Sequence, residues 1–131
     1  MSQTVAGPQG GIHPKTAVAG AAVAKGQLLK RGADQNTLIP NTAATIETIG
    51  VAADDQDTAG RTFPYHSNPG ETVLVRSGAA FALDARLTSD ASGRAITAAS
   101  TNKSTLVARE AATAADQLVV AEILGANSVA P

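Results

Sequence analysis

The sequence predicts an all-β protein preceded by an extended N-terminal arm, and three observations support this. Short runs rich in β-branched residues recur along the chain, of which TVLVRS at 72–77 and QLVVAEIL at 117–124 are the clearest. Glycine, proline, asparagine and aspartate divide these runs every few positions, as turns divide the strands of small β domains. The third observation is an internal repeat, described below.

Three segments divide the chain of 131 residues, which has the length of one domain. We expect a flexible arm over 1–15, a β domain over 16–126 and a C-terminal tail over 127–131. Closely spaced glycines and prolines interrupt the arm, which has few large apolar side chains with which to order itself.

The expected strands follow from the short apolar runs. GAAVAKGQLL at 20–29 is rich in alanine, but a helix there would have to pass through Gly20 and Gly26, so a turn at Lys25–Gly26 between two strands fits better. RTFPY at 61–65 contains Pro64 and is predicted to be at best an edge strand. AREAATAAD at 108–116 is left open between a short helical turn and an irregular segment. The expected strands cover 16–24, 27–31, 37–40, 45–52, 61–65, 72–77, 94–98, 104–108 and 117–124.

A shift of 58 residues aligns the two halves of the chain. GAAVAKGQLLKRGADQNTLI at 20–39 then lies on GAAFALDARLTSDASGRAIT at 78–97, and six positions are identical between Gly20 and Ala33. The same shift places Ile49–Gly50 on Val107–Ala108. We interpret this as two related units, each a strand, a turn, a strand, a polar turn and a strand.

The composition excludes several classes of function. Hydrophobic residues make up 44% of the chain, but 28 of them are alanine and only three are aromatic, so a single small core would bury little area. Such a chain is expected to gain stability by contact with copies of itself or with a partner. The net charge is −1 with no basic cluster, which argues against nucleic acid binding. The absence of cysteine, of a signal-peptide pattern and of a long apolar run predicts a soluble protein without disulfides that is made in the cytoplasm.

No catalytic or cofactor motif is present, and we predict neither enzyme activity nor a bound cofactor. The two histidines, His13 and His66, do not have metal-ligand spacing. Asp55, Asp57 and Gly60 match part of a calcium loop, but Ala59 and His66 occupy positions that need ligands, so we interpret this loop as a solvated acidic turn. Aspartates 34, 84, 90 and 116 lie in turn contexts, where their carboxylates bond the local backbone rather than acting as acid–base pairs.

The order of these features over about residues 17–124 resembles the capsid decoration, or cement, proteins of tailed bacteriophages. The resemblance rests on GAAVAKGQLL, on IGVA at 49–52, on Gly60 after the acidic loop, and on GETVLVRSGAAFAL, SDASGRAITA and LVVAEIL further on. Asp84 departs from the family, which often has glycine in that turn, but aspartate tolerates the same left-handed backbone.

The resemblance implies a small β-barrel or β-tulip-like domain, commonly a homotrimer, on the outer surface of an expanded phage capsid. Its partners would be the major capsid protein and copies of itself, without nucleic acid or membrane, and its location would be the virion. We predict that the arm contacts the capsid by adding a strand to a sheet edge. The expected contact residues are Val5, Pro8, Ile12, His13 and Pro14. The alternative is a small β module that binds a ligand or carbohydrate, for which the sequence offers few aromatic residues.

Overall fold

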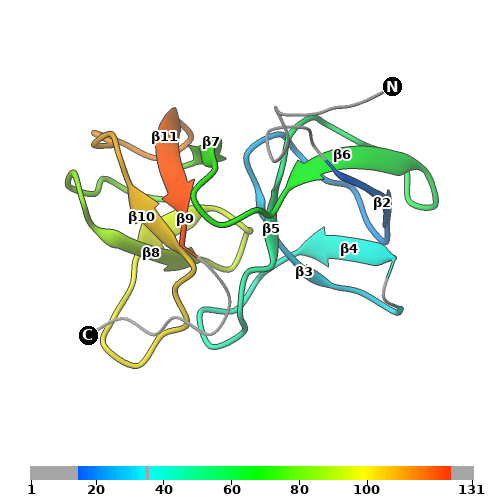
Figure 1. The fold of residues 1–131 in the computed structure, drawn as a ribbon, viewed down its shortest axis with the longest axis horizontal. Coiled ribbons are helices and arrows are strands. Elements are labelled where there is room, and N and C mark those ends of the chain that lie inside the picture. Colours follow the sequence, from blue (N-terminus) through cyan, green and yellow to red (C-terminus); the bar gives the residue numbers. More distant parts are fainter. Residues whose placement is uncertain (1–14, 35, 125–131) are drawn as a thin grey trace, which may run out of the picture.

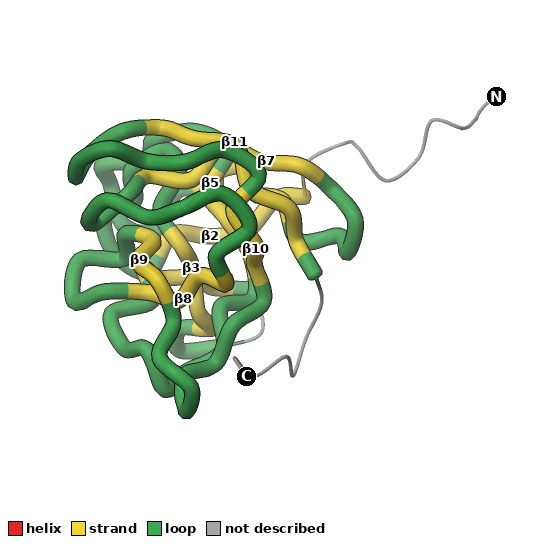
Figure 2. The backbone as a smooth tube through the Cα atoms, turned by 90° about the vertical axis from the view of Figure 1, so that its left-hand side faces the viewer, coloured by secondary structure: helices red, strands yellow, loops and turns green. Residues whose placement is uncertain are grey.

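The computed structural model describes residues 15–34 and 36–124, and every regular element within them is a β-strand (Figures 1 and 2). The all-β prediction is therefore confirmed. The strands are β2 (Lys15–Ala19), β3 (Leu28–Arg31), β4 (Thr37–Pro40), β5 (Gly50–Ala52), β6 (Thr62–His66), β7 (Thr72–Arg76), β8 (Arg86–Ser89), β9 (Ala95–Thr97), β10 (Leu106–Ala108) and β11 (Leu118–Ile123). Among the described residues no helix is long and apolar enough to cross a membrane.

The first unit comprises β2 to β6, which form a closed barrel in the order β2-β4-β3-β5-β6. Its β2–β4 pair is parallel and its other pairs are antiparallel. The prediction of an edge strand at 61–65 is wrong, because β6 lies between β2 and β5. Pro64 is tolerated there because it faces Ala53, one residue beyond the end of β5, and accepts the Ala53 N–H at 3.0 Å. Proline has no backbone N–H, and the hydrogen bond that it cannot donate falls at the end of the β5–β6 ladder.

The second unit comprises β7 to β11, which form a sheet in the order β7-β11-β10-β8-β9. Its consecutive pairs are all antiparallel. A single parallel bridge between Ser77 and Ala95 joins the two ends of this strand order. In the first unit, the parallel β2–β4 pair closes the barrel at the equivalent place. The second unit therefore repeats the topology of the first with a weaker closure.

The registers confirm that the two units are repeats. A shift of 58 residues carries Leu28 and Leu29 of β3 onto Arg86 and Leu87 of β8, and their partners on β5 and β10 correspond as well. The connection from β8 to β10 is two residues shorter than that from β3 to β5. The shift consequently falls to 56 for the last two strands of each unit, and Gly50 corresponds to Leu106. The predicted match of Ile49–Gly50 with Val107–Ala108 is therefore out by two positions.

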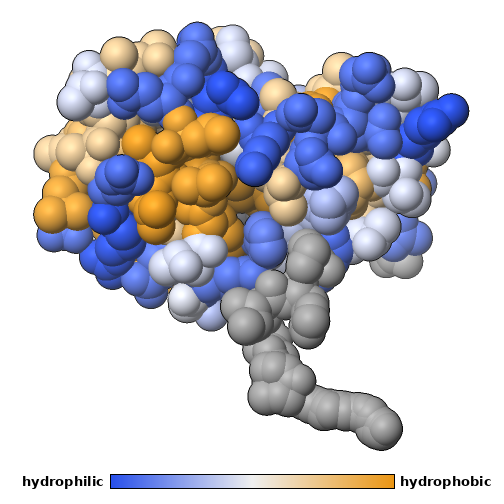
Figure 3. All heavy atoms as spheres, turned by 90° about the horizontal axis from the view of Figure 1, so that it is seen from above, coloured by the Kyte–Doolittle hydropathy of each residue, from blue (hydrophilic) through white to orange (hydrophobic). Residues whose placement is uncertain are grey.

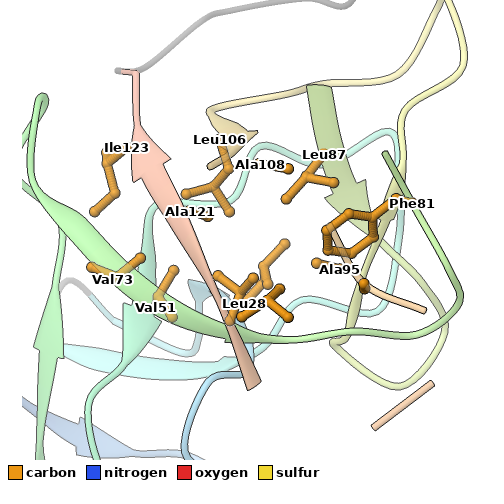
Figure 4. Packing of buried hydrophobic residues seen from close by; sticks show 13 residues of the cluster. Leu28, Val51, Val73, Phe81, Leu87, Ala95, Leu106, Ala108, Ala121 and Ile123 are labelled. Atoms are coloured by element: carbon orange, nitrogen blue, oxygen red, sulfur yellow. The ribbon is translucent and has the colours of Figure 1, made fainter. Parts of the chain in front are cut away.

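Two apolar clusters stabilise the units, and one of them joins the units together. Leu29, Leu38 and Phe63 fill the first barrel with small residues around them. The larger cluster occupies the second unit but also contains Leu28 and Val51 from the outside of the first barrel (Figure 4). The two units are thus packed against each other through side chains that point away from the first barrel.

Three local expectations were wrong or incomplete. Residues 108–116 contain no helix, since Ala112 instead exchanges both backbone hydrogen bonds with Phe81. The strand β8 was not among the expected runs, although the repeat alignment placed it opposite β3. The expected strand over 45–52 is extended only at Gly50–Ala52, because residues 44 and 45 form a turn.

Candidate interaction surface

The predicted capsid-contact residues lie outside the described part of the chain. Val5, Pro8, Ile12, His13 and Pro14 all precede residue 15, as does most of the predicted arm, and the whole of the predicted tail follows residue 124. The structure does describe the junction, at which Lys15 of β2 is exposed and pairs with Tyr65 of β6. The arm therefore joins the chain at the first unit.

The acidic loop that connects β5 to β6 uses its carboxylates locally. Asp55 Oδ1 accepts the Lys25 N–H at 2.7 Å, and Asp57 Oδ1 accepts the Thr58 hydroxyl at 3.1 Å. Val23 and Gln56 exchange two backbone hydrogen bonds, which hold the loop against the β2–β3 connection. Within residues 15–34 and 36–124, no group of three histidine or acidic side chains could hold a metal ion. These contacts support the interpretation of this segment as a structural turn.

The predicted turn aspartates bond their own backbone or a neighbouring arginine. Asp34 accepts the Asn36 N–H at 2.9 Å, and Asp90 accepts N–H groups from Ser92 and Arg94. Asp84 and Asp116 have left-handed backbone, with φ of 67° and 64°. The expectation that the carboxylates bond the local backbone is confirmed for Asp34 and Asp90, whereas the carboxylates of Asp84 and Asp116 pair with Arg109 and Arg94.

Two arginine networks connect the loops of the second unit. The hydrogen bond that Arg94 donates to Asp116, followed by the charge of Asp90, raises the pKa of Arg94 above its ordinary value. Arg109 bridges Asp84 and Glu122 at 2.9 Å each, and the hydrogen bond to Glu122 is the larger cause of its raised pKa. The side chains of Arg109 and Asp84 are 42% and 65% exposed, so this pair contributes little to stability, whereas the Arg94–Asp90 pair is partly buried.

A further pair, formed by His66 and Glu71, is partly buried. His66 Nδ1 lies 2.6 Å from Glu71 Oε2, and only 3% of the Glu71 side chain is exposed. The other carboxylate oxygen accepts the Asn68 N–H at 3.3 Å. This pair closes the turn between β6 and β7 and thereby fixes the connection between the two units.

We predict that His66→Ala lowers the free energy of unfolding by about 1–3 kcal/mol, because it leaves the buried Glu71 carboxylate without its partner. Chemical denaturation monitored by circular dichroism measures the change. Arg109→Ala is the matched control, since it breaks an exposed pair and should change stability little. An equal effect of the two substitutions would contradict the assigned role of the His66–Glu71 pair.

An apolar cleft of about 270 Å³ lies between the two units. Ile49, Val51, Leu106 and Ile123 line it, and Glu47 is its one charged residue. An apolar side chain or a small ligand would fit this volume, but no set of convergent polar groups is present to orient a reacting molecule.

The outer face of β7 and β11 presents an apolar patch, defined here as Leu74, Leu118 and Val120. Leu74 and Val120 are opposite one another in the register, and Leu118 lies one step along the same face. Leu74 is 40% and Leu118 is 37% exposed, whereas Val73, Val75 and Val119 point inward. Seen from above, the second unit shows a broad hydrophobic area bordered by hydrophilic residues (Figure 3).

The repeat shows that the fold does not require this patch. The corresponding residues of the first unit are Thr16, Thr62 and Pro64, which occupy the same register positions on β2 and β6. Two of these three positions are hydroxyl residues, so leucine is not needed there for folding. Exposed apolar groups with no folding role are typical of interaction surfaces.

The sequence analysis did not identify this patch, although the signal was present. It recognised TVLVRS as a strand but did not ask which of its residues faces outward. At the shift of 58, Leu74 aligns with Thr16, so this leucine could be identified from the sequence. Leu118 aligns with Thr62 only at the shift of 56 that the registers show.

The fold and this surface define a protein of two tandem five-stranded β units with an apolar face on the second unit. No protein family and no curated protein matches the sequence. Among solved structures, the chain is similar to the N base of the head fiber gp8.5 of bacteriophage phi29, with a TM-score of 0.67 and 24% sequence identity. The match covers 83% of this chain and 91% of the phi29 chain. The likeness establishes the shared fold.

Proposed function

We propose that this chain is a structural protein of a phage virion that binds the outer surface of the capsid and stabilises it. The observation that carries this proposal is the fold shared with the base of a phage head fiber over most of both chains. The sequence resemblance to decoration proteins points to the same class independently. In this proposal the chain is not an enzyme, and its partners are the major capsid protein and further copies of itself.

The arrangement of the chain suits such a role. The arm enters at Lys15 on the first unit, whereas the apolar patch lies on the second unit. One molecule can therefore use the arm for the shell and keep the second unit free for another contact. Several weak arm contacts, linked through an oligomer, would give tight attachment.

The carbohydrate-binding alternative finds no support in the aromatic residues. Phe63 and Phe81 are buried, with 2% and 6% exposed. Tyr65 is partly buried and packs on Phe63, with ring centroids 6.4 Å apart. None of the three presents a free ring face on which a sugar would stack.

We predict that deleting residues 2–14 abolishes binding to the shell and leaves the β units folded. Co-sedimentation of the purified protein with undecorated heads, expanded and unexpanded, measures the binding. The full chain should bind expanded heads saturably, and the truncated chain should remain in the supernatant with an unchanged melting temperature.

Val5→Asp together with Ile12→Asp is the matched variant that keeps the length of the arm. It should lose binding as the deletion does, because the apolar anchors are gone. Full binding by the truncated chain would refute the arm as the attachment, and absence of binding by the intact folded chain would refute the proposed function.

A further inference from the structure

The two units contact each other through a β-turn of the first unit. Gly26, in the turn Ala24–Gln27, is buried, and its carbonyl accepts the Arg76 N–H at 2.9 Å. A Cβ at Gly26 would lie 2.7 Å from Leu118 Cδ2. The turn therefore rests on one end of the β7–β11 face, against Leu118, which is one member of the apolar patch.

The second unit contains the same turn, but among the described residues this turn does not rest on another unit. The turn Ala82–Ala85 has the same hydrogen bonds as the turn Ala24–Gln27. The Asp84 N–H donates to Ala108 O, just as the Gly26 N–H donates to Ala52 O. In both turns the N–H of the last residue donates to the carbonyl of the first. The left-handed residue has φ of 67° in one turn and 85° in the other. Leu83 at the tip is 58% exposed, the highest value of any large apolar residue described.

The position equivalent to the Arg76 contact is already occupied in the first unit. The Val18 N–H, which corresponds to that of Arg76, donates to Asn36 O within its own barrel at 2.8 Å. The neighbouring residue Thr62, which corresponds to Leu118, is polar. The equivalent N–H of each unit is therefore used within the single chain, by Asn36 O in the first unit and by Gly26 O in the second. The units differ in the residue beside it, which is Leu118 in the second unit and Thr62 in the first.

We propose that the patch of Leu74, Leu118 and Val120 on one copy of this chain receives the Leu83 turn of a second copy. The contact would extend the face that already holds the turn of the first unit. Arg76 is paired with Leu118 in the register, so this arginine adjoins the face. An apolar residue entering an apolar patch beside an arginine has the composition of a protein–protein contact. This inference deepens the proposed function because it names the surface through which copies of the chain associate. It rests on the proposed function only for the biological purpose of that contact.

Sedimentation velocity of the full chain in solution tests the contact without any capsid. Wild-type protein should self-associate, and Leu83→Asp and Leu74→Asp should each weaken association at least about tenfold in Kd, as loss of one buried anchor does. Both residues are exposed in the single chain, so the melting temperature of the dilute variants checks that they still fold. Ile46→Asp is the matched control, because Ile46 is 41% exposed but lies outside both surfaces.

Site-specific cross-linking then tests the pairing itself, since the chain contains no cysteine. A Leu83→Cys chain is mixed with a Leu74→Cys chain of different mass and treated with a short bismaleimide. The mixed cross-link should form, whereas a Thr16→Cys chain, altered at the equivalent position of the first unit, should give little.

Monomeric wild-type protein at all concentrations would overturn the inference, as would association that neither aspartate substitution weakens. Preferential cross-linking to position 16 would also overturn it. Loss of self-association together with retained shell binding removes this contact and leaves the proposed function intact. Self-association without shell binding supports this contact and refutes the proposed function.

Discussion

Gly26→Ala is expected to destabilise the protein more than any other single exchange of glycine for alanine in a turn. Two effects add at this position. The left-handed backbone, with φ of 85°, costs a residue with a Cβ about 1–2 kcal/mol. The new Cβ would also lie 2.8 Å from the backbone nitrogen of Arg76, and such overpacking adds about 1–3 kcal/mol.

Gly60→Ala separates the two effects. Gly60 has φ of 90°, close to that of Gly26, but a Cβ there would meet nothing within 4 Å. Gly60→Ala should therefore be destabilised only by the cost of placing alanine in left-handed backbone. Urea unfolding of both variants measures the difference, which reports the close approach of the two units at Gly26. Equal losses would show that the turn does not press on the second unit as described.

Much of the fold could be predicted because its strands are short β-branched runs separated by turn residues. The strands at 28–31, 37–40, 72–76 and 118–123 fall within the expected segments. The predicted turn at Lys25–Gly26 is confirmed, and Gly26 has left-handed backbone there. Asp84 occupies the equivalent position in the second unit with φ of 67°, as its tolerance of that conformation allows.

Long-range pairing overrode local preference at two places, one where the prediction was left open and one where it was wrong. Alanine favours helix at 108–116, but Ala112 is bridged to Phe81, 31 positions earlier. Pro64 favoured an edge strand. Proline is nevertheless accommodated inside the barrel, because the β5–β6 ladder ends where Pro64 has no N–H to donate. Neither partner can be known from the segment itself.

The interaction surface was the least predictable feature, because it depends on which residues face outward after folding. The predicted contact residues of the arm, among them Val5 and Ile12, lie outside the described residues and stay predictions. The apolar patch became visible only when the two repeats could be compared position by position. Repeated units provide such a comparison whenever one copy keeps a polar residue where the other has leucine.

The second large effect is expected at Leu28, whose fully buried side chain connects the two units. Leu28 and Leu29 are adjacent on β3, both with 0% exposed, but they point to opposite faces. Leu29 belongs to the interior of the first barrel, whereas Leu28 packs with Val73, Val75 and other residues of the second unit. Truncation of either to alanine should cost about 2–5 kcal/mol, the usual range for a buried leucine.

The two substitutions should differ in cooperativity rather than in size. Leu29→Ala weakens the first barrel and leaves the contact between units, so unfolding should remain a single transition with an unchanged m-value. Leu28→Ala removes a side chain shared by both units, so the units should unfold in separable steps with a lower apparent m-value. Hydrogen exchange measured by mass spectrometry assigns each step to its unit. A single transition with the wild-type m-value in Leu28→Ala would show that the other contacts between the units, such as Arg76 N–H to Gly26 O, are sufficient to couple them.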